Sequence, residues 1–231
     1  MRKLINFSVI VPFILFTLLA CGSNRSADTN EFYSFNDSDT IYETAEEGNT
    51  SKWLESDGLE IQNVEEGSNG SSRSILVKEN WLRDENGDLK KSENGNLTNL
   101  AHYELPMNNE KQFILEFDKM RKIGGNDISY CFTVGVKLDT EYGERLISFN
   151  TFFDLAKMDS MEQWLVEDMV KEMVFPLSMN YVNEVNTWKR LRFDLEASLH
   201  EFEPDNKINK VISFYFQGGD DYLDNIRLVS E

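Results

Sequence analysis

Few side chains of this sequence are of the kinds that carry out covalent or metal chemistry. Its 231 residues include only two histidines and two cysteines, which leaves little for a zinc site. The sequence contains no serine nucleophile elbow, phosphate-binding loop or histidine-rich metal motif. His102, Tyr103 and Arg145 have the chemistry of a base and a cation for an elimination reaction, but no catalytic motif surrounds them. The sequence therefore argues against an enzyme.

Acidic side chains are abundant, with 41 Asp and Glu against 23 Lys and Arg and a formal net charge of −18. Because nucleic acid is bound by neutralising its phosphates with Lys and Arg, this balance argues against a nucleic-acid partner. A glycosidase would need two positioned carboxylates, and the strand patterns show no such constellation. Most of these acids are expected to be solvated.

The first residues have the pattern of an export signal. Arg2 and Lys3 precede an apolar run over residues 4–19, which is short for a membrane span. The run ends in Leu-Leu-Ala-Cys-Gly at residues 18–22, which resembles the lipobox of bacterial lipoproteins. The resemblance implies a lipoprotein signal peptide over residues 1–20 and palmitate or similar acyl chains on Cys21, which anchor the protein in the membrane.

The residue after the cysteine refines this expectation. Gly22, where a sorting aspartate is absent, implies the outer membrane of the bacterial cell envelope. The alternative is an ordinary secretory signal with a chance cysteine. Residues 21–40 are then a lipidated N-terminus and flexible tether, because the stretch is polar and rich in small residues. Lipidation of Cys21 would leave Cys131 without a disulfide partner, so residues 41–231 must be held by their core.

From residue 41 onward, short segments with period-two alternation are separated by turn signals. The clearest is residues 128–138, where six large apolar residues alternate with small or polar ones. This pattern predicts an all-β sandwich of two antiparallel sheets. Residues 159–174 are the exception, because Met161, Trp164, Leu165 and Met169 recur at three- and four-residue spacing, which predicts one amphipathic helix inserted between strands.

The two ends of this region resemble a known family. Residues 42–53 hold a glutamate segment, a glycine turn and Trp53, and residues 222–228 read Tyr-Leu-Asp-Asn-Ile-Arg-Leu. This combination is similar to the jelly-roll β-sandwich of carbohydrate-binding modules and galactose-binding-like domains. The resemblance implies that the first and last strands lie side by side and that the domain binds a polysaccharide or oligosaccharide without catalysis.

The same resemblance implies a structural Ca²⁺ at the edge shared by those strands. Calcium takes six to eight oxygen ligands from carboxylates and carbonyls. Glu43, Glu46 and Asp224 match the acidic positions of the family and are the expected metal ligands.

Sugar-binding sandwiches stack aromatic rings on pyranose rings and bond hydroxyls with polar side chains. Trp81, which opens a polar loop, and Tyr103 and Arg145, which lie on predicted strands, are the candidate ligand-binding residues. Two alternatives stay open: a structural or protein-interaction module of an envelope complex, and a jelly-roll polysaccharide lyase or glycosidase. The oligomeric state and the glycan are not encoded in the spacing of these residues.

Overall fold

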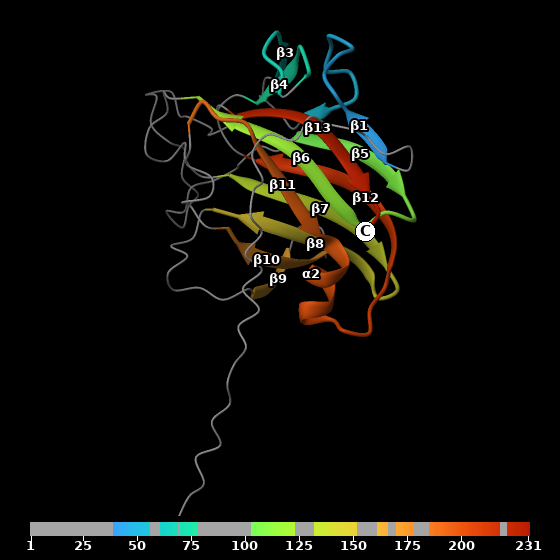
Figure 1. Ribbon diagram of the computed structural model, residues 1–231. Helices are drawn as coiled ribbons and strands as arrows, with labels where there is room; N and C mark the ends of the chain where they lie inside the picture. The colour runs from blue at the N-terminus through green and yellow to red at the C-terminus, as the bar shows by residue number, and fades with distance from the viewer. Residues whose placement is uncertain are drawn as a thin grey trace, which may run out of the picture.

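The computed structural model describes residues 39–55, 61–68, 70–77, 103–122, 132–151, 161–165, 170–177, 185–217 and 221–231. These residues form two β-sheets and one short helix (Figure 1). Among them, no helix is long and apolar enough to cross a membrane.

The first sheet has six strands. It consists of β1 (Thr40–Glu43), β3 (Ile61–Val64), β4 (Ser74–Val77), β6 (Ile114–Arg121), β11 (Lys189–Asp194) and β13 (Asp221–Val229). Their order is β11-β6-β13-β4-β3, and β1 pairs with the C-terminal half of β13.

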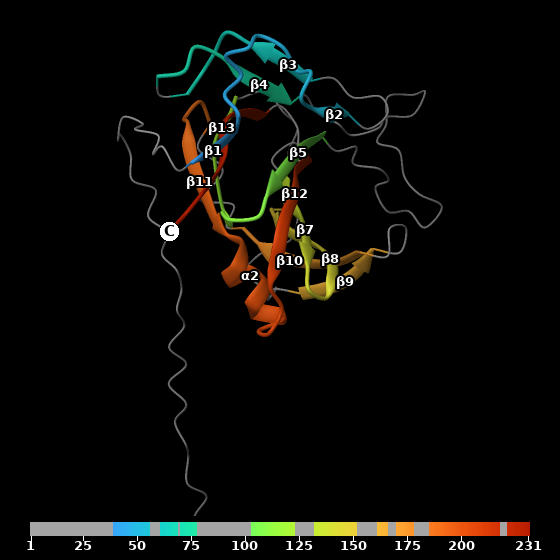
Figure 2. The ribbon, with the colours of Figure 1, turned by 90° about the vertical axis from the view of Figure 1, so that its right-hand side faces the viewer.

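The second sheet has seven strands. It consists of β2 (Leu54–Glu55), β5 (Tyr103–Asn109), β7 (Thr133–Thr140), β8 (Gly143–Asn150), β9 (Met161–Leu165), β10 (Val170–Pro176) and β12 (Ile208–Gln217). Their order is β2-β5-β12-β7-β8-β10-β9. Figure 2 shows the two layers side by side, with the helix α2 (Leu195–Phe202) at one end.

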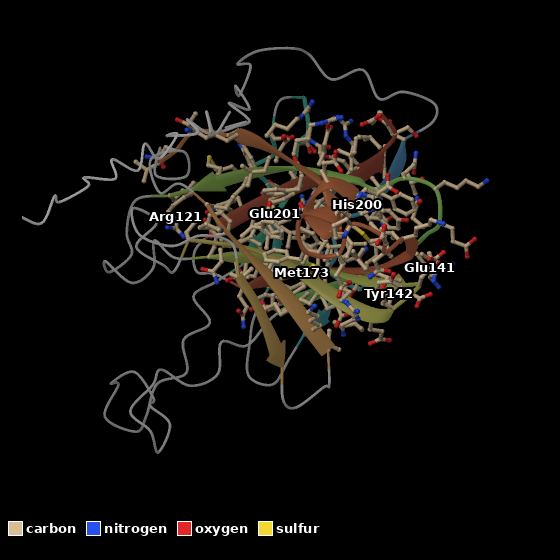
Figure 3. The ribbon with its side chains drawn as sticks, turned by 90° about the horizontal axis from the view of Figure 1, so that it is seen from below. Arg121, Glu141, Tyr142, Met173, His200 and Glu201 are labelled. Carbon is tan, nitrogen blue, oxygen red and sulfur yellow. The ribbon has the colours of Figure 1, made fainter. Side chains whose placement is uncertain are left out.

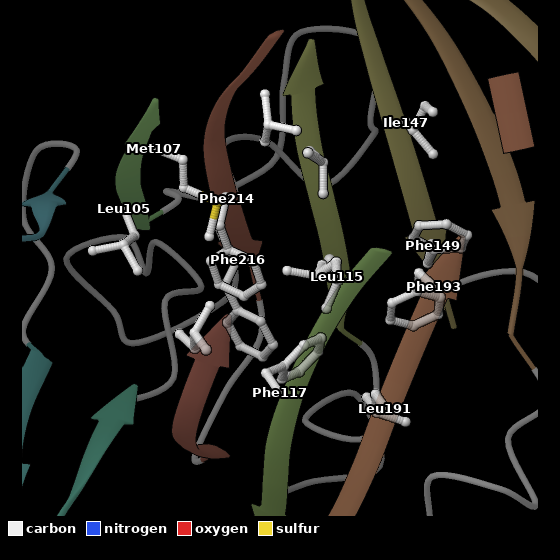
Figure 4. Packing of buried hydrophobic residues seen from close by; sticks show 14 of the residues in the cluster. Leu105, Met107, Leu115, Phe117, Ile147, Phe149, Leu191, Phe193, Phe214 and Phe216 are labelled. Atoms are coloured by element: carbon white, nitrogen blue, oxygen red, sulfur yellow. The ribbon is translucent and has the colours of Figure 1, made fainter. Parts of the chain in front are cut away.

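Aromatic side chains from both sheets meet in the core (Figure 4). Phe117 on β6 contacts Phe214 on β12 edge to face at 5.4 Å, and Phe193 on β11 stacks on Phe149 of β8 at 4.0 Å between ring centroids. Such pairs add stability beyond the apolar area that they bury. The fold is therefore the jelly-roll β-sandwich that the sequence predicts.

The first and last strands lie side by side, as predicted. β1 pairs antiparallel with β13, with Thr40 opposite Leu228 and Glu43 opposite Ile226. The predicted strand over residues 128–138 is confirmed from Thr133 onward, where β7 begins, and residues 128–131 lie outside the described residues. Val134, Val136 and Leu138 face the core, which is the face that the alternation assigned to them.

The helix predicted over residues 159–174 is wrong. The described residues of this stretch form β9 and β10, which pair antiparallel with each other. β10 also pairs in parallel with β8, so the second sheet is mixed rather than purely antiparallel. The apolar residues of this stretch belong to two short strands that follow one another along the chain, and their combined spacing imitates that of a helix.

The described residues do form one helix, α2, in a part of the chain for which the sequence analysis predicts none. α2 begins after Asp194, whose side chain accepts a hydrogen bond from the N–H of Ala197 at 2.9 Å. This is the interaction by which an aspartate caps a helix N-terminus. Leu195 and Leu199 are buried, so α2 covers one end of the sandwich.

Candidate functional site

The outer face of the seven-stranded sheet carries an aromatic ring among polar side chains. In each strand, side chains alternate between the core and the outer face. Because Phe214 and Phe216 of β12 point into the core, Tyr215 points outward. It lies opposite Glu104 of β5 on one side and Gly135 of β7 on the other. Gly135 in turn lies opposite Ser148 of β8.

The ring of Tyr215 lies across Gly135. A Cβ atom placed on Gly135 would be 2.6 Å from Cδ1 of Tyr215 and 3.1 Å from Cδ1 of Leu146. Any larger residue would displace the tyrosine ring, because real Cβ atoms do not approach that closely. A glycine inside a strand often marks such a close approach. Gly135 therefore leaves the space next to the sheet that the half-buried ring of Tyr215 occupies.

A buried carboxylate lies on the same face. Glu172 of β10 is 8% exposed, and its Oε1 accepts a hydrogen bond from the hydroxyl of Ser148 at 2.5 Å. Burial, and then the charge of Glu172, raise the pKa of Tyr215 above its usual range. Tyr215 is consequently a neutral phenol, which suits stacking and hydrogen bonding and does not suit a catalytic base.

The charges of this face are mainly negative. Among the residues that the structure describes, Glu104, Asp139 and Glu144 join Glu172 on this face, against the lysines Lys137 and Lys210. The ammonium of Lys137 lies 4.0 Å from the carboxylate of Glu104. We call Glu104, Gly135, Ser148, Glu172 and Tyr215 the Tyr215 face.

The structure does not bring the predicted ligand residues together. Tyr103 is fully buried in the core, so its ring has no surface to offer a sugar. Arg145 is 7% exposed and points to the core side of β8, where Nε and Nη2 each donate to a carboxylate oxygen of Glu203 at 3.0 Å. Trp81 lies outside the described residues and stays a prediction.

Tyr103 and Arg145, which were considered for a lyase, are also far from each other. β12 and β7 lie between β5 and β8 in the sheet. Cross-strand pairing places Phe149 of β8 level with Tyr103 of β5. Arg145 lies four residues away from Phe149 along β8. Strand spacing and rise place the Cα atoms of Tyr103 and Arg145 roughly 20 Å apart. His102 lies outside the described residues. Tyr103 and Arg145 therefore cannot act on one bond.

The predicted calcium ligands each have hydrogen-bond donors of their own. Glu43 accepts from the N–H of Ala45 at 2.7 Å and from the indole of Trp53 at 2.9 Å. Hydrogen bonds from Ser71 and Ser72 lower the pKa of Glu46 to about 2. These donors occupy the oxygens that a cation would need.

Asp224 belongs to a different cluster. Its Oδ2 accepts from the N–H of Ser68 at 2.9 Å, and its cross-strand neighbour Asp118 accepts from the hydroxyl of Ser68 and from Asn225, both at 2.9 Å. Within the described ranges, no three His, Cys, Asp or Glu side chains are placed to hold a metal ion. Glu43, Glu46 and Asp224 therefore do not fit a shared calcium site.

Large apolar side chains are rarely exposed in the described part of the chain. Ile41, Leu54 and Tyr142 are the exposed ones, and they come from β1, β2 and the turn between β7 and β8. Figure 3 views the molecule from the side of α2, with Tyr142 in that turn and away from His200 of the helix. Scattered apolar residues are normal on a protein surface, so they do not favour a protein-interaction module.

Sequence reasoning did not select Tyr215 or Glu172. Tyr215 lies within Phe214-Tyr215-Phe216, where three aromatic residues in succession hide which one faces outward. Gly135 did give a signal, because the alternation of residues 128–138 places it on the face opposite the core with small and polar neighbours.

No family model and no curated protein matches this chain. Some solved structures resemble it at low sequence identity. The CBM22-1 xylan-binding domain from Paenibacillus barcinonensis is 11% identical, with a TM-score of 0.41, and the match covers 85% of this chain and 99% of that one. A family 11 carbohydrate-binding module from Clostridium thermocellum, solved with a β-1,3-1,4-mixed-linked tetrasaccharide, is 10% identical, with a TM-score of 0.40 over 83% of this chain and 95% of that one.

The buried carboxylate of Asp118 makes stability depend on pH. Burial raises its pKa to about 6, against hydrogen bonds from Asn225 and Ser68 that lower it. The folded state therefore binds more protons than the unfolded state between about pH 4 and pH 6. The stability from this group is fully present below about pH 4 and is lost as the pH rises through about 6.

We expect the free energy of unfolding of the wild type, relative to Asp118→Asn, to fall by up to about 3 kcal/mol between pH 4 and pH 7. Urea unfolding at several pH values measures this difference. Parallel curves for the two proteins would contradict the assignment.

Chelation tests the calcium prediction. Because Glu43, Glu46 and Asp224 already accept hydrogen bonds from protein donors, we expect the melting temperature to be the same with EDTA and with added calcium. Differential scanning calorimetry measures it. A fall of several degrees in EDTA, restored by calcium, would show that this edge of the domain binds the ion after all.

Proposed function

We propose that this chain is a bacterial envelope lipoprotein whose β-sandwich binds a glycan without catalysis, through the Tyr215 face. The observation that carries the proposal is the close approach of the Tyr215 ring to Gly135, with a buried carboxylate on the same face. A flat aromatic ring stacks on the C–H face of a pyranose, and a carboxylate accepts hydrogen bonds from sugar hydroxyls.

Each residue has a defined role in this proposal. Tyr215 supplies the stacking surface, and Gly135 sets its orientation. Ser148 holds Glu172 in place through a 2.5 Å hydrogen bond. Glu104, directly opposite Tyr215 on β5, supplies a second acceptor on the other side of the ring.

Glu104 and Glu172 are too far apart to act as the carboxylate pair of a glycosidase. Four strand steps separate β5 from β10, which places the Cα atoms of Glu104 and Glu172 roughly 19 Å apart. The two carboxyls of a glycosidase lie at most about 9.5 Å apart. Glu104 and Glu172 therefore flank a bound sugar chain and do not act together on one glycosidic bond.

The anchoring part of the proposal is supported by the sequence alone. Arg2 and Lys3, the apolar run over residues 4–19 and Cys21 form the pattern of a lipoprotein signal. Acyl chains on Cys21 would hold the domain at the outer membrane through the stretch of chain that precedes β1. Metabolic labelling with an alkyne-tagged palmitate analogue tests this, because Cys21→Ala should abolish the label.

Binding to immobilised glycans tests the role of the Tyr215 face. We expect Tyr215→Ala to weaken binding by about tenfold or more, because it removes the stacking surface. Gly135→Ala should weaken it as well, since the new Cβ displaces the ring. Tyr142→Ala is the control, because it removes the ring of another tyrosine, which is exposed and lies away from the Tyr215 face in the turn at the α2 end of the domain.

Isothermal titration calorimetry measures these affinities, and thermal melting checks that each variant is folded. If folded Tyr215→Ala binds as tightly as the wild type, the Tyr215 face is not the site. A Trp81→Ala variant assayed in parallel tests the residue that the sequence predicts as a contact.

The negative charge of the Tyr215 face should favour neutral glycans over acidic ones. Four carboxylates against two lysines repel a chain of uronates, so we expect neutral glycans to bind more tightly than polygalacturonate or alginate. Raising the salt concentration should narrow the difference, because it screens the repulsion. Titrations of both glycan classes at two salt concentrations measure this. Tighter binding of the polyuronates at low salt would contradict it.

A further inference from the structure

The first strand of the sandwich, β1, is very short. β1 spans four residues and pairs with β13 alone. Its start, Thr40, lies opposite Leu228, close to the end of the chain, and its last residue, Glu43, lies opposite Ile226. A strand of this length makes few main-chain hydrogen bonds, so its attachment to the domain depends on side chains.

A ladder of alternating charges crosses the sheet at the start of β1. Asp39 lies 3.7 Å from the guanidinium of Arg227 on β13, and Arg227 donates to Glu116 on β6 at 2.7 and 3.0 Å. Glu116 also pairs with Arg192 on β11. The side chains of Asp39, Arg227 and Glu116 are nearly fully buried, at 5%, 6% and 8% exposed. Removing one partner of such a buried ion pair is strongly destabilising, because the other charge is left buried without compensation.

Two further contacts hold β1 at its ends. The hydroxyl of Thr40 donates to Gln112 at 2.5 Å and accepts from Asn109, the last residue of β5, at 3.3 Å. This contact ties β1 to the second sheet as well as to the first. At the other end, the carboxylate of Glu43 accepts from the indole of the buried Trp53.

The direction of a pull decides how these contacts are loaded. β13 runs from Asp221 at one end of the sandwich to Val229 beside Thr40 at the other. A pull on the chain before Asp39, resisted at the far end of the sheet, acts mainly along the strands and stresses all contacts of β1 together. A pull between that point and Glu231 separates the two adjacent strand ends and breaks the contacts one after another.

We propose that β1 and the Asp39–Arg227–Glu116–Arg192 ladder form a mechanical clamp that keeps the domain folded when its N-terminal attachment is under tension. The tension itself requires the proposed lipid anchor and glycan ligand. The clamp is inferred from the contacts of β1 alone. The clamp resists tension directed along the strands and yields readily when Thr40 and the C-terminus are drawn apart.

Single-molecule force spectroscopy tests this on the chain from Cys21 onward, with Cys131→Ser as background. In one version the handles are Cys21 and Thr187→Cys, an exposed position before β11 at the far end of the sheet. In the other they are Cys21 and a cysteine added after Glu231. We expect the first to withstand clearly higher force before β1 detaches. Equal rupture forces in the two geometries would overturn the proposal.

Asp39→Asn tests the ladder itself. We expect it to shorten the lifetime of the folded domain under constant force along the strands by about tenfold, because it removes one partner of a buried ion pair. The control is Glu47→Gln, which breaks the exposed pair between Glu47 and Lys52 and should leave the lifetime unchanged. An Asp39→Asn lifetime equal to the wild type would overturn the role of the ladder, whatever the outcome of the glycan-binding assays.

Discussion

The rest of this structure depends on one constraint: successive side chains of each strand point alternately to the core face and to the outer face of its sheet. Phe214 and Phe216 commit one face of β12 to the core, where Phe214 meets Phe117 of the opposite sheet. Tyr215 then has to point outward, and a shift of one residue would bury it and expose both phenylalanines. The position of the candidate site is thus fixed by the same aromatic packing that holds the two sheets together.

Burial of charge is the second theme of the molecule. Asp221 is fully buried, and it pairs with both Lys119 and Arg121 at one end of the sandwich. Glu203, near the end of α2, accepts from Arg145 and Lys171 at the other. Desolvation lowers the pKa of Lys119 even though Asp221 favours its charged form. Such pairs contribute little net stability but strongly penalise any arrangement that separates the partners, so they specify which strands meet.

Much of the fold follows from the sequence because its signals are local. The alternation over residues 133–138 predicts a strand and its buried face, and both are confirmed. The pairing of the first and last strands followed from a resemblance confined to the two ends of the domain. The helix prediction over residues 159–174 was wrong because apolar residues of two consecutive short strands imitate helical spacing, and the sequence between them, residues 166–169, contains no glycine or proline to signal a break.

The site was harder to predict, and Arg145 shows why. Arg145 and Leu146 are successive residues of β8 and so lie on opposite faces of the sheet, but alternation alone does not decide which of the two faces the core. β8 is apolar on both faces, with Leu146 on one and Ile147 and Phe149 on the other. Packing settles the choice, because Phe149 stacks on Phe193 of the opposite sheet and thereby turns Arg145 inward.

An inward arginine needs a counter-charge, and Glu203 supplies it from a part of the chain 58 residues away. That partner is defined only once α2 has covered the end of the sandwich, which no spacing along β8 reveals. Tyr215 and Glu172 are likewise 43 residues apart and meet on one face because β12, β7, β8 and β10 are neighbours in the sheet. Alternation determines that a side chain lies on one face or the other, whereas the order of the strands determines what it meets there.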